Sequence, residues 1–228
     1  MKVTVIIPAL NEEAAIGKVL KEIPVPPVTE VLVSDNGSTD ATASLASELG
    51  AKVVFEAEKG YGAACLRALS LIDDRTDIVV FLDADHSDYP EEIPLLIAPI
   101  INENIDLVIG SRVRGQSQKG SLTPQQVFGN WLATRLIKLI WRFDYSDLGP
   151  FRAVRFESLQ KLCMQDRNFG WTVEMQIKAV KQKLSIREVP VSYRKRTGQS
   201  KISGTLSGSF KAGCKILYTI AKYGLLTR

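Results

Sequence analysis

Two aspartates directly follow a strongly apolar stretch of the chain. The residues from Ile78 to Leu82 are all apolar, and Asp83 and Asp85 come next, separated only by Ala84. An uninterrupted apolar run of this length is typical of a strand buried on both faces of a sheet. Side chains two positions apart on an extended chain point to the same side, so we expect the two carboxylates to project together and Ala84 to point away. Such a pair of oxygen donors suits Mg²⁺ or Mn²⁺ shared with the phosphate groups of a ligand.

The same pair also fits a plainer interpretation. Two acidic residues at this spacing are common in solvated turns, where they cap the helix that follows. For an isolated pair this interpretation would be preferred. The choice depends on whether other polar side chains converge on the same place.

Strands and helices are expected to alternate along the first 110 residues. Apolar and β-branched runs predict strands at residues 3–7, 31–34, 53–55, 78–82 and 107–109, with helices between them. This alternation predicts an α/β fold, namely a Rossmann-like, mostly parallel sheet with right-handed crossovers and helices on both faces.

Acidic side chains follow three of the predicted strands. Glu12 comes after the first, Asp35 after the second, and Asp83 and Asp85 after the fourth. Because ligands bind at the carboxyl ends of parallel strands, we expect these carboxylates to meet at one ligand. For Asp35 two interpretations stay open: it accepts a hydrogen bond from a ribose or base, or it belongs only to the turn at 36–40.

The two halves of the chain carry opposite charge. Residues 1–110 contain 19 acidic and 7 basic side chains, whereas residues 111–228 contain 6 acidic and 22 basic ones. An acidic half can hold a metal ion and sugar hydroxyls. A basic half suits phosphate, an anionic membrane surface or nucleic acid, unless both charges serve only solubility.

Composition places the chain among globular proteins that bury a substantial core. Its 228 residues are 45% hydrophobic and 24% charged. The three cysteines are far apart, which predicts neither a disulfide framework nor a metal site and favours a reducing compartment. The start of the chain shows no signal-peptide pattern, and the apolar run from Ile93 to Ile101 is too short to span a bilayer. We therefore expect a cytoplasmic protein.

Five short motifs stand in order along the chain: Pro8–Glu12, Ser34–Asp40, Gly60–Ala64, Asp83–Asp85 and Gly110–Arg112. Together they resemble a family 2 glycosyltransferase of the GT-A fold. Within that family the resemblance is greatest to the dolichol-phosphate mannosyltransferase and polyprenyl-phosphate glycosyltransferase group. It covers about residues 3 to 205.

The resemblance implies a nucleotide-sugar donor, a UDP- or GDP-hexose, with Mg²⁺ or Mn²⁺ as cofactor and inversion at the anomeric carbon. The donor-binding positions that match the family in the acidic half are Pro8, Leu10, Glu12, Val33, Asp35, Asp83, Ala84 and Asp85. Asp83 and Asp85 match the metal-binding carboxylates. The family's second metal position falls on Ser87, with His86 and Asp88 beside it, where the lipid-phosphate enzymes often have Gln. His86 is expected to face solvent.

The basic half supplies the remaining matches. Arg112 corresponds to an arginine that contacts phosphate near the reacting centre, and its planar fork suits paired oxygens. Asp147 lies where many family members have a catalytic base. Because a hydroxyl acceptor needs a base and an ionised phosphate does not, Asp147 is either that base or a group that orients an arginine.

Three further basic positions are expected to contact the donor phosphates. They are Lys195, Arg196 and Lys201, in a segment that resembles a flexible loop of the lipid-phosphate group. Arg194 and Arg196 flank Lys195, so the sequence leaves open which cation acts. Positive charge placed there would stabilise the departing nucleotide.

Two amphipathic segments complete the chain. Residues 124–141 form a broad apolar stripe with basic edges, which fits a core helix or an interfacial helix near a lipid acceptor. Residues 206–228 are predicted to form a C-terminal amphipathic helix. The predicted organisation is thus a GT-A domain at 1–205, with a nucleotide-sugar half at 1–110 and an acceptor half at 111–205, followed by this helix.

The resemblance, taken with these patterns, implies an inverting, metal-dependent hexosyltransferase that acts on a polyprenyl (dolichyl-like) phosphate and contacts the membrane peripherally at its cytoplasmic face. Two alternatives stay open: transfer to a small soluble hydroxyl acceptor, and a nucleotide-sugar-binding subunit without catalysis. Nucleic acid is not an expected partner, and the oligomeric state is left open.

Overall fold

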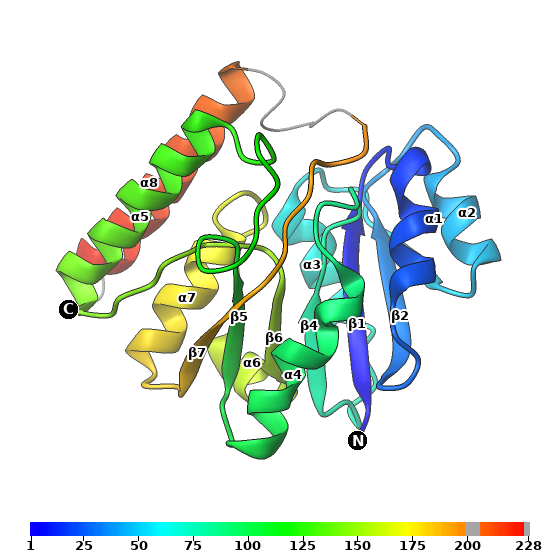
Figure 1. The fold of residues 1–228 in the computed structure, drawn as a ribbon, viewed down its shortest axis with the longest axis horizontal. Helices are drawn as coiled ribbons and strands as arrows, with labels where there is room; N and C mark the ends of the chain where they lie inside the picture. Colours follow the sequence, from blue (N-terminus) through cyan, green and yellow to red (C-terminus); the bar gives the residue numbers. More distant parts are fainter. Residues whose placement is uncertain (199–205, 226–228) are drawn as a thin grey trace.

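The computed structural model of the chain describes residues 1–198 and 206–225. Within these ranges, seven strands form one sheet with helices on both of its faces (Figure 1). The strands are β1 (Val3–Ala9), β2 (Val28–Asp35), β3 (Lys52–Phe55), β4 (Ile78–Phe81), β5 (Leu107–Ser111), β6 (Arg152–Arg155) and β7 (Ile186–Pro190). Their order across the sheet is β3-β2-β1-β4-β6-β5-β7.

All neighbouring strands run parallel except β6, which is antiparallel to both β4 and β5. The central strand β1 has β2 on one side and β4 on the other, so the chain changes direction across the sheet between β1 and β4. In sheets of this kind the crevice at such a switch point is the usual ligand site. The predicted mostly parallel α/β sheet is confirmed.

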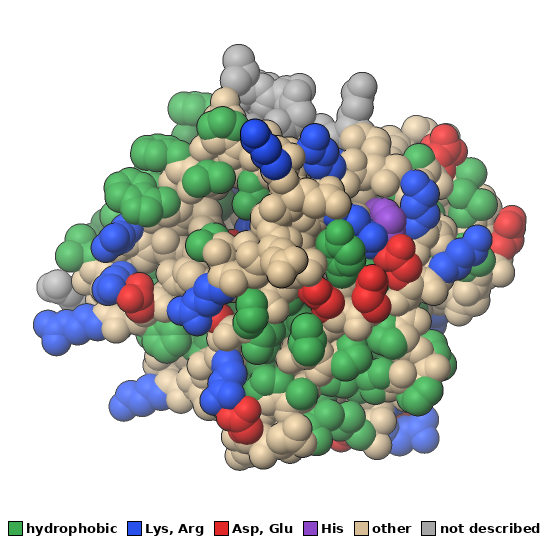
Figure 2. Space-filling model, viewed as in Figure 1, with side chains coloured by type: hydrophobic (Ala, Val, Ile, Leu, Met, Phe, Trp, Pro, Cys, Tyr) green, Lys and Arg blue, Asp and Glu red, His purple; other side chains and the backbone are tan. Residues whose placement is uncertain are grey.

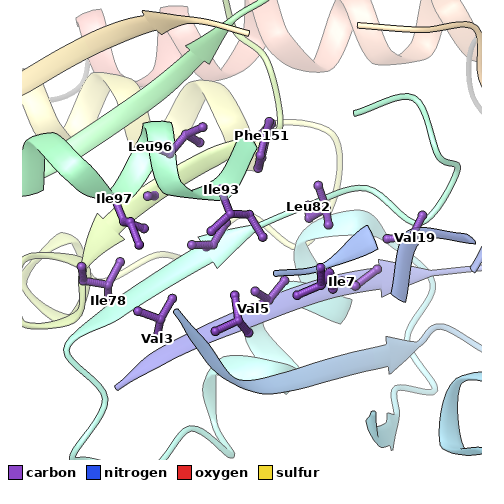
Figure 3. Close-up of a cluster of buried hydrophobic side chains, with 14 of the residues drawn as sticks. Val3, Val5, Ile7, Val19, Ile78, Leu82, Ile93, Leu96, Ile97 and Phe151 are labelled. Atoms are coloured by element: carbon purple, nitrogen blue, oxygen red, sulfur yellow. The ribbon is translucent and has the colours of Figure 1, made fainter. Parts of the chain in front are cut away.

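Both faces of the sheet are covered, as the apolar strand sequences require. Along β1, Val3, Val5 and Ile7 enter one core, while Ile6 enters the other. Figure 3 shows the first core, where these β1 side chains face α4 residues such as Ile93. Successive side chains of a strand point to opposite faces of the sheet. Because helices cover both faces, the side chains on both sides of the buried strands are apolar, and polar residues do not alternate with them.

The helices divide between the two cores. The first core takes apolar side chains from α1 (Glu13–Glu22), α2 (Thr42–Glu48) and α4 (Ile93–Asn102), which follows the 3-10 turn η1 (Pro90–Glu92). The second takes them from α3 (Tyr61–Leu69), α5 (Pro124–Trp141), α6 (Phe156–Leu162), α7 (Trp171–Lys181) and α8 (Leu206–Leu225).

Three local expectations differ from the structure. The fourth strand ends at Phe81 instead of Leu82, so Asp83 to Asp85 lie in a turn. Residues 189–193 also have the pattern of a short late strand, but the strand lies at 186–190, because its pairing with β5 sets its limits. Strand β6 and helix α6 were not predicted, since four residues flanked by arginines carry no strand periodicity.

Helices α5 and α8 lie side by side along one edge of the molecule (Figure 1). Helix α5 begins with a capping box. The Thr123 hydroxyl accepts a hydrogen bond from the Gln126 backbone N–H, and the Gln126 side chain accepts one from the Thr123 backbone N–H. Within the described ranges, no helix has the length and apolar character needed to cross a membrane.

Candidate active site

A cleft of about 300 Å³ opens at the carboxyl ends of β1 and β4. It therefore lies at the switch point of the sheet. Of the residues expected to bind the donor, those that line it are Pro8, Leu10, Glu12, Asp83, Ala84, Asp85 and Arg196. The structure thus brings carboxylates and an arginine from three distant parts of the chain to one cleft.

The two aspartates of the motif have different surroundings. The Tyr61 hydroxyl donates to Asp83 Oδ1 at 3.2 Å. Asp85 Oδ1 accepts from the backbone N–H and the hydroxyl of Ser87, at 2.9 and 2.5 Å. Ala84 also lines the cleft and does not point away as expected, because the extended strand has ended before it. Burial, together with the charge of Asp85, raises the pKa of Asp83 to about 7.

Among the described basic residues of its segment, Arg196 is the one that reaches the cleft. Its Nη2 lies 2.8 Å from Glu12 Oε1 and its Nη1 lies 3.3 Å from Asp85 Oδ2. Lys195 is exposed and is not among the lining residues. Arg194 donates to the backbone carbonyls of His86 and Asp88 instead. The expected contact from Lys201 lies outside the residues that the structure describes.

Two predicted donor residues are near the cleft without lining it. Val33 is fully buried in the first core. Asp35 pairs with Ala9 across the β1–β2 register, at the edge where the cleft opens, and its carboxylate accepts from the Ser38 backbone N–H. In this state Asp35 stabilises the turn that carries Asn36, and Asn36 lines the cleft.

His86 does not face solvent as expected. Its ring nitrogen Nε2 lies 2.9 Å from Glu22 Oε1, and only 13% of the side chain is exposed. Glu22 also accepts from Arg194. These contacts attach the loop after Asp85 to α1 and to the segment that carries Arg196.

One wall of the cleft was not predicted. Asn168 and Phe169 line it from the loop between α6 and α7. A Cβ atom added to Gly62 would lie only 1.9 Å from the Asp166 carbonyl oxygen, and the Ala63 N–H donates to the Arg167 carbonyl at 2.9 Å. The glycine of the Gly60–Ala64 motif is therefore required for close approach of this loop, which is the only sign of the loop in the sequence.

Arg112 and Asp147 form a buried, two-pronged ion pair. The Arg112 Nε and backbone N–H donate to Asp147 Oδ2, each at 2.8 Å, and Nη2 donates to Oδ1 at 2.7 Å. Burial alone would lower the pKa of Arg112, but the bonds to Asp147 outweigh it and raise that pKa above its usual value. Both Asp147 oxygens thus hold the guanidinium.

A second cleft, of about 400 Å³, lies beside this ion pair. It is bounded by Arg112 and Asp147 on one side and by Trp131, Arg135 and other residues of α5 on the other. The ion pair therefore stands at the wall of this second cleft.

The carboxylates near the first cleft fit part of a metal site. Across residues 1–198 and 206–225, no three His, Cys, Asp or Glu side chains are arranged to hold a metal ion by themselves. Asp83 and Asp85 would therefore share it with ligand phosphates, as Mg²⁺ commonly requires. The nearby Asp88 is 1% exposed, and neither carboxylate oxygen has a hydrogen-bond partner among the described residues. Burial and the charges of Asp83 and Asp85 raise the pKa of Asp88 well above its usual value.

Comparison with known proteins identifies the family. The model of glycosyl transferase family 2 matches residues 4–163. The chain belongs to this family and is a glycosyltransferase, as the motifs predicted. An uncharacterized glycosyltransferase of Mycobacterium tuberculosis is 38% identical over 214 residues, which cover 92% of this chain and 94% of that protein. A dolichyl-phosphate hexose transferase of Haloferax volcanii is 32% identical over 209 residues, which cover 90% of this chain and 88% of that protein.

The fold is also similar to a solved structure, glucosyl-3-phosphoglycerate synthase from Mycobacterium tuberculosis in complex with Mn²⁺, UDP and glucosyl-3-phosphoglycerate. The TM-score is 0.75 at 26% identity, covering 98% of this chain and 80% of that one. The same enzyme has also been solved with Mg²⁺ and UDP. This similarity confirms the expected GT-A fold.

Proposed function

We propose that this glycosyltransferase transfers a hexose from a UDP- or GDP-sugar to a polyprenyl phosphate, with Mg²⁺ or Mn²⁺ bound at Asp83 and Asp85. The donor would lie in the first cleft, with Glu12 and Asn36 toward the nucleoside and Arg196 toward the diphosphate. The metal would offset negative charge on the diphosphate as it leaves. The metal and UDP in the complexes of the M. tuberculosis synthase support this arrangement.

Our choice of a phosphate as the acceptor depends on the ion pair between Arg112 and Asp147. Both oxygens of Asp147 accept hydrogen bonds from Arg112, and Asp147 is fully buried, so it is poorly placed to take a proton from a hydroxyl. An acceptor phosphate is already ionised and needs no base. Arg112 can orient such a phosphate so that its oxygen forms the bond to the anomeric carbon while the bond to the leaving diphosphate breaks.

The outer faces of α5 and α8 suit a lipid acceptor. Both helices lack acidic residues, and α5 carries Arg135 and Lys138 while α8 carries three lysines. Their exposed apolar side chains are Val127, Phe128, Trp131, Leu139, Ile140, Phe210, Leu217, Tyr218 and Leu225. In Figure 2, hydrophobic side chains with Lys and Arg between them follow the α5 edge. We propose that this face, the α5–α8 face, contacts an anionic membrane surface.

The similarity to glucosyl-3-phosphoglycerate synthase favours a second candidate, transfer to a small phosphorylated hydroxyl acceptor such as the phosphoglycerate bound in that enzyme's complexes. The relative from Haloferax volcanii favours the lipid. In the second case Asp147 would have to leave Arg112 to act as a base.

A transfer assay separates the two. Purified protein with Mn²⁺ is given radiolabelled UDP- or GDP-hexoses together with either a polyprenyl phosphate in detergent or 3-phosphoglycerate. We expect product only with the lipid. Product only with 3-phosphoglycerate, lost in Asp147→Asn while UDP binding is retained, would establish the second candidate instead.

A further inference from the structure

The guanidinium of Arg112 is held on two sides. One edge, formed by Nε and Nη2, donates to both carboxylate oxygens of Asp147. One face lies over the ring of Tyr193, with Arg112 Cζ 5.1 Å from the ring centroid. This distance is within the range of a favourable cation–π contact. Asp147 therefore fixes one edge of the guanidinium, and Tyr193 fixes the tilt of its plane.

The other edge of the guanidinium is available to a ligand. Arginine presents its N–H donors as a planar fork that can bind paired oxygens. Among residues 1–198 and 206–225, Arg112 Nη1 makes no hydrogen bond, and Arg112 lines the second cleft together with Asp147. The edge formed by Nη1 and Nη2 can thus receive two oxygens of a phosphate that enters this cleft.

The ring of Tyr193 is fixed through its backbone. Tyr193 is 7% exposed and lines neither cleft. Its N–H donates to the Gln116 carbonyl at 2.9 Å, and its carbonyl accepts from the Gln118 N–H at 2.8 Å. Strands β5 and β7 pair so that Ser111 lies opposite Pro190, and the segments that follow them leave the sheet as neighbours. Tyr193 is therefore placed by the fold and not by contact with a substrate.

We propose that Tyr193 is a positioning residue for glycosyl transfer, whose ring fixes the plane of the Arg112 guanidinium so that Nη1 and Nη2 meet the acceptor phosphate. This inference rests on the proposed function, because it takes Arg112 as the group that contacts this phosphate. Tyr193 acts through Arg112 and does not touch the acceptor. Misplacement of a reacting group by about 1 Å can lower a rate roughly a hundredfold, so loss of the ring should appear in kcat.

A purely structural role of the ring would give a different result. Replacement by Leu would then lower stability and change kcat no more than the loss of another buried ring does. If Tyr193 acts through Arg112, its replacement has little further effect once the planar guanidinium is gone, because residues that act as a unit are not additive. Arg112→Lys provides that background, since it keeps a cation for Asp147 and removes the planar fork.

The test measures kcat, the KM for the nucleotide sugar and Tm in Tyr193→Phe, Tyr193→Leu, Arg112→Lys and the double variant of the last two. Each protein is assayed with Mn²⁺ and UDP- or GDP-hexoses, and with two acceptors, a polyprenyl phosphate in detergent and 3-phosphoglycerate. We expect Tyr193→Leu to lower kcat at least about tenfold. The KM for the nucleotide sugar should stay within about twofold, because the backbone that leads to Arg196 is unchanged.

The other variants separate the ring from the rest of the side chain. Tyr193→Phe keeps the ring and should keep kcat within about threefold of wild type. In the Arg112→Lys background, Tyr193→Leu should change kcat less than about twofold. If Tyr193→Leu does not fold, Tyr193→Met fills the space with a flexible apolar chain and is judged by the same limits.

Phe156→Leu is the matched control. Phe156 is 9% exposed, and it directly follows β6, where Arg155 pairs with Ile78 at the start of β4. It therefore lies at the end of the sheet opposite the clefts. Its replacement should lower Tm about as much as Tyr193→Leu does and leave kcat within about twofold of wild type.

The inference is overturned if Tyr193→Leu keeps kcat within twofold of wild type, if Tyr193→Phe loses as much as Tyr193→Leu, or if the losses from Tyr193→Leu and Arg112→Lys multiply in the double variant. Product with 3-phosphoglycerate alone, with the expected pattern of kcat, removes the lipid from the proposed function and keeps the role of Tyr193. If the wild type glycosylates neither acceptor, the proposed function fails, and the role of Tyr193 in transfer fails with it.

Discussion

Lys215 of α8 and Asp166 of the loop between α6 and α7 form an ion pair, with Lys215 Nζ 2.8 Å from Asp166 Oδ2. The other oxygen of Asp166 accepts from the backbone N–H groups of Asn168 and Gly170. Asn168 lines the proposed donor cleft. The C-terminal helix therefore holds one wall of the donor site, and the Tyr223 hydroxyl reinforces this link by donating to Glu174 at 2.7 Å.

Replacement of Lys215 by Met should weaken donor binding. Lys215 is 34% exposed and Asp166 is 8% exposed, so the pair contributes about 1 kcal/mol, which corresponds to roughly a fivefold change in affinity. We expect the Kd for UDP with Mn²⁺, measured by calorimetry, to rise about three- to fivefold. Lys211→Met, on an exposed position of the same helix, should leave it unchanged. Equal effects of the two variants would show that α8 does not act through Asp166.

Gly62→Ala should disrupt the same wall from the other side. The new Cβ would lie 1.9 Å from the Asp166 carbonyl oxygen, and backbone atoms cannot retreat as a flexible side chain would. We expect a loss of about 2 kcal/mol in the free energy of unfolding and a weaker affinity for UDP. Gly129→Ala is the matched control in α5, where a Cβ meets nothing within 4 Å. It should be neutral or stabilise the protein by up to about 1 kcal/mol, since Ala is the better helix former.

The sequence predicted those parts of the fold and site that depend on local pattern. Strands β1 and β4 are apolar runs, and the acidic residues that follow them had to meet at one sheet edge. The loop carrying Asn168 and Phe169 could not be found in this way, because its position depends on packing against Gly62 and on an ion pair with Lys215, about fifty residues away. Its residues have no pattern of their own.

The site also depends on pairings that no sequence pattern specifies. Lys195 and Arg196 are chemically similar neighbours, and only the fold determines that Arg196 reaches Glu12 and Asp85. The sequence alone left open whether Asp147 is a catalytic base or a group that orients an arginine. Its engagement by Arg112 follows from the end of β5 lying beside the 146–149 segment.

Arg196→Met should reduce donor affinity strongly, whereas Lys195→Met should not. Arg196 contacts the cleft carboxylates and would move onto the diphosphate when donor and metal bind, because the phosphate oxygens are stronger partners for its fork. We expect at least a tenfold rise in the KM for the nucleotide sugar in Arg196→Met and less than a twofold change in Lys195→Met. A larger effect from Lys195 would mean that the segment rearranges on binding and would contradict the assignment of Arg196.

Asp147→Asn should destabilise the protein as well as impair transfer. The side chains of Asp147 and Arg112 are 1% and 13% exposed, and removal of one charge leaves the buried guanidinium without its counterion. Loss of one partner from a buried pair costs roughly 3–5 kcal/mol, and Asn retains one acceptor, so we expect about 3 kcal/mol in urea denaturation. An unchanged stability would contradict the ion pair as a structural element and would favour a catalytic role alone.

Leu139→Gln should weaken attachment to anionic vesicles if the α5–α8 face contacts a membrane. Leu139 is 78% exposed on α5, which also exposes Trp131 and Ile140, and it is next to Lys138 in the sequence. Burial of a leucine in the interface contributes about 1.5–3 kcal/mol, so one substitution should lower the partition coefficient at least tenfold in vesicle flotation. Leu95→Gln, at a position 50% exposed on α4, is the matched control and should bind as wild type does.

Binding of the wild type to the vesicles should also fall with added salt, because salt screens the charges of the basic residues of α5 and α8. Flotation that is equal for both variants, or absent for the wild type, would remove the membrane from the proposal and leave a soluble phosphorylated acceptor as the better candidate.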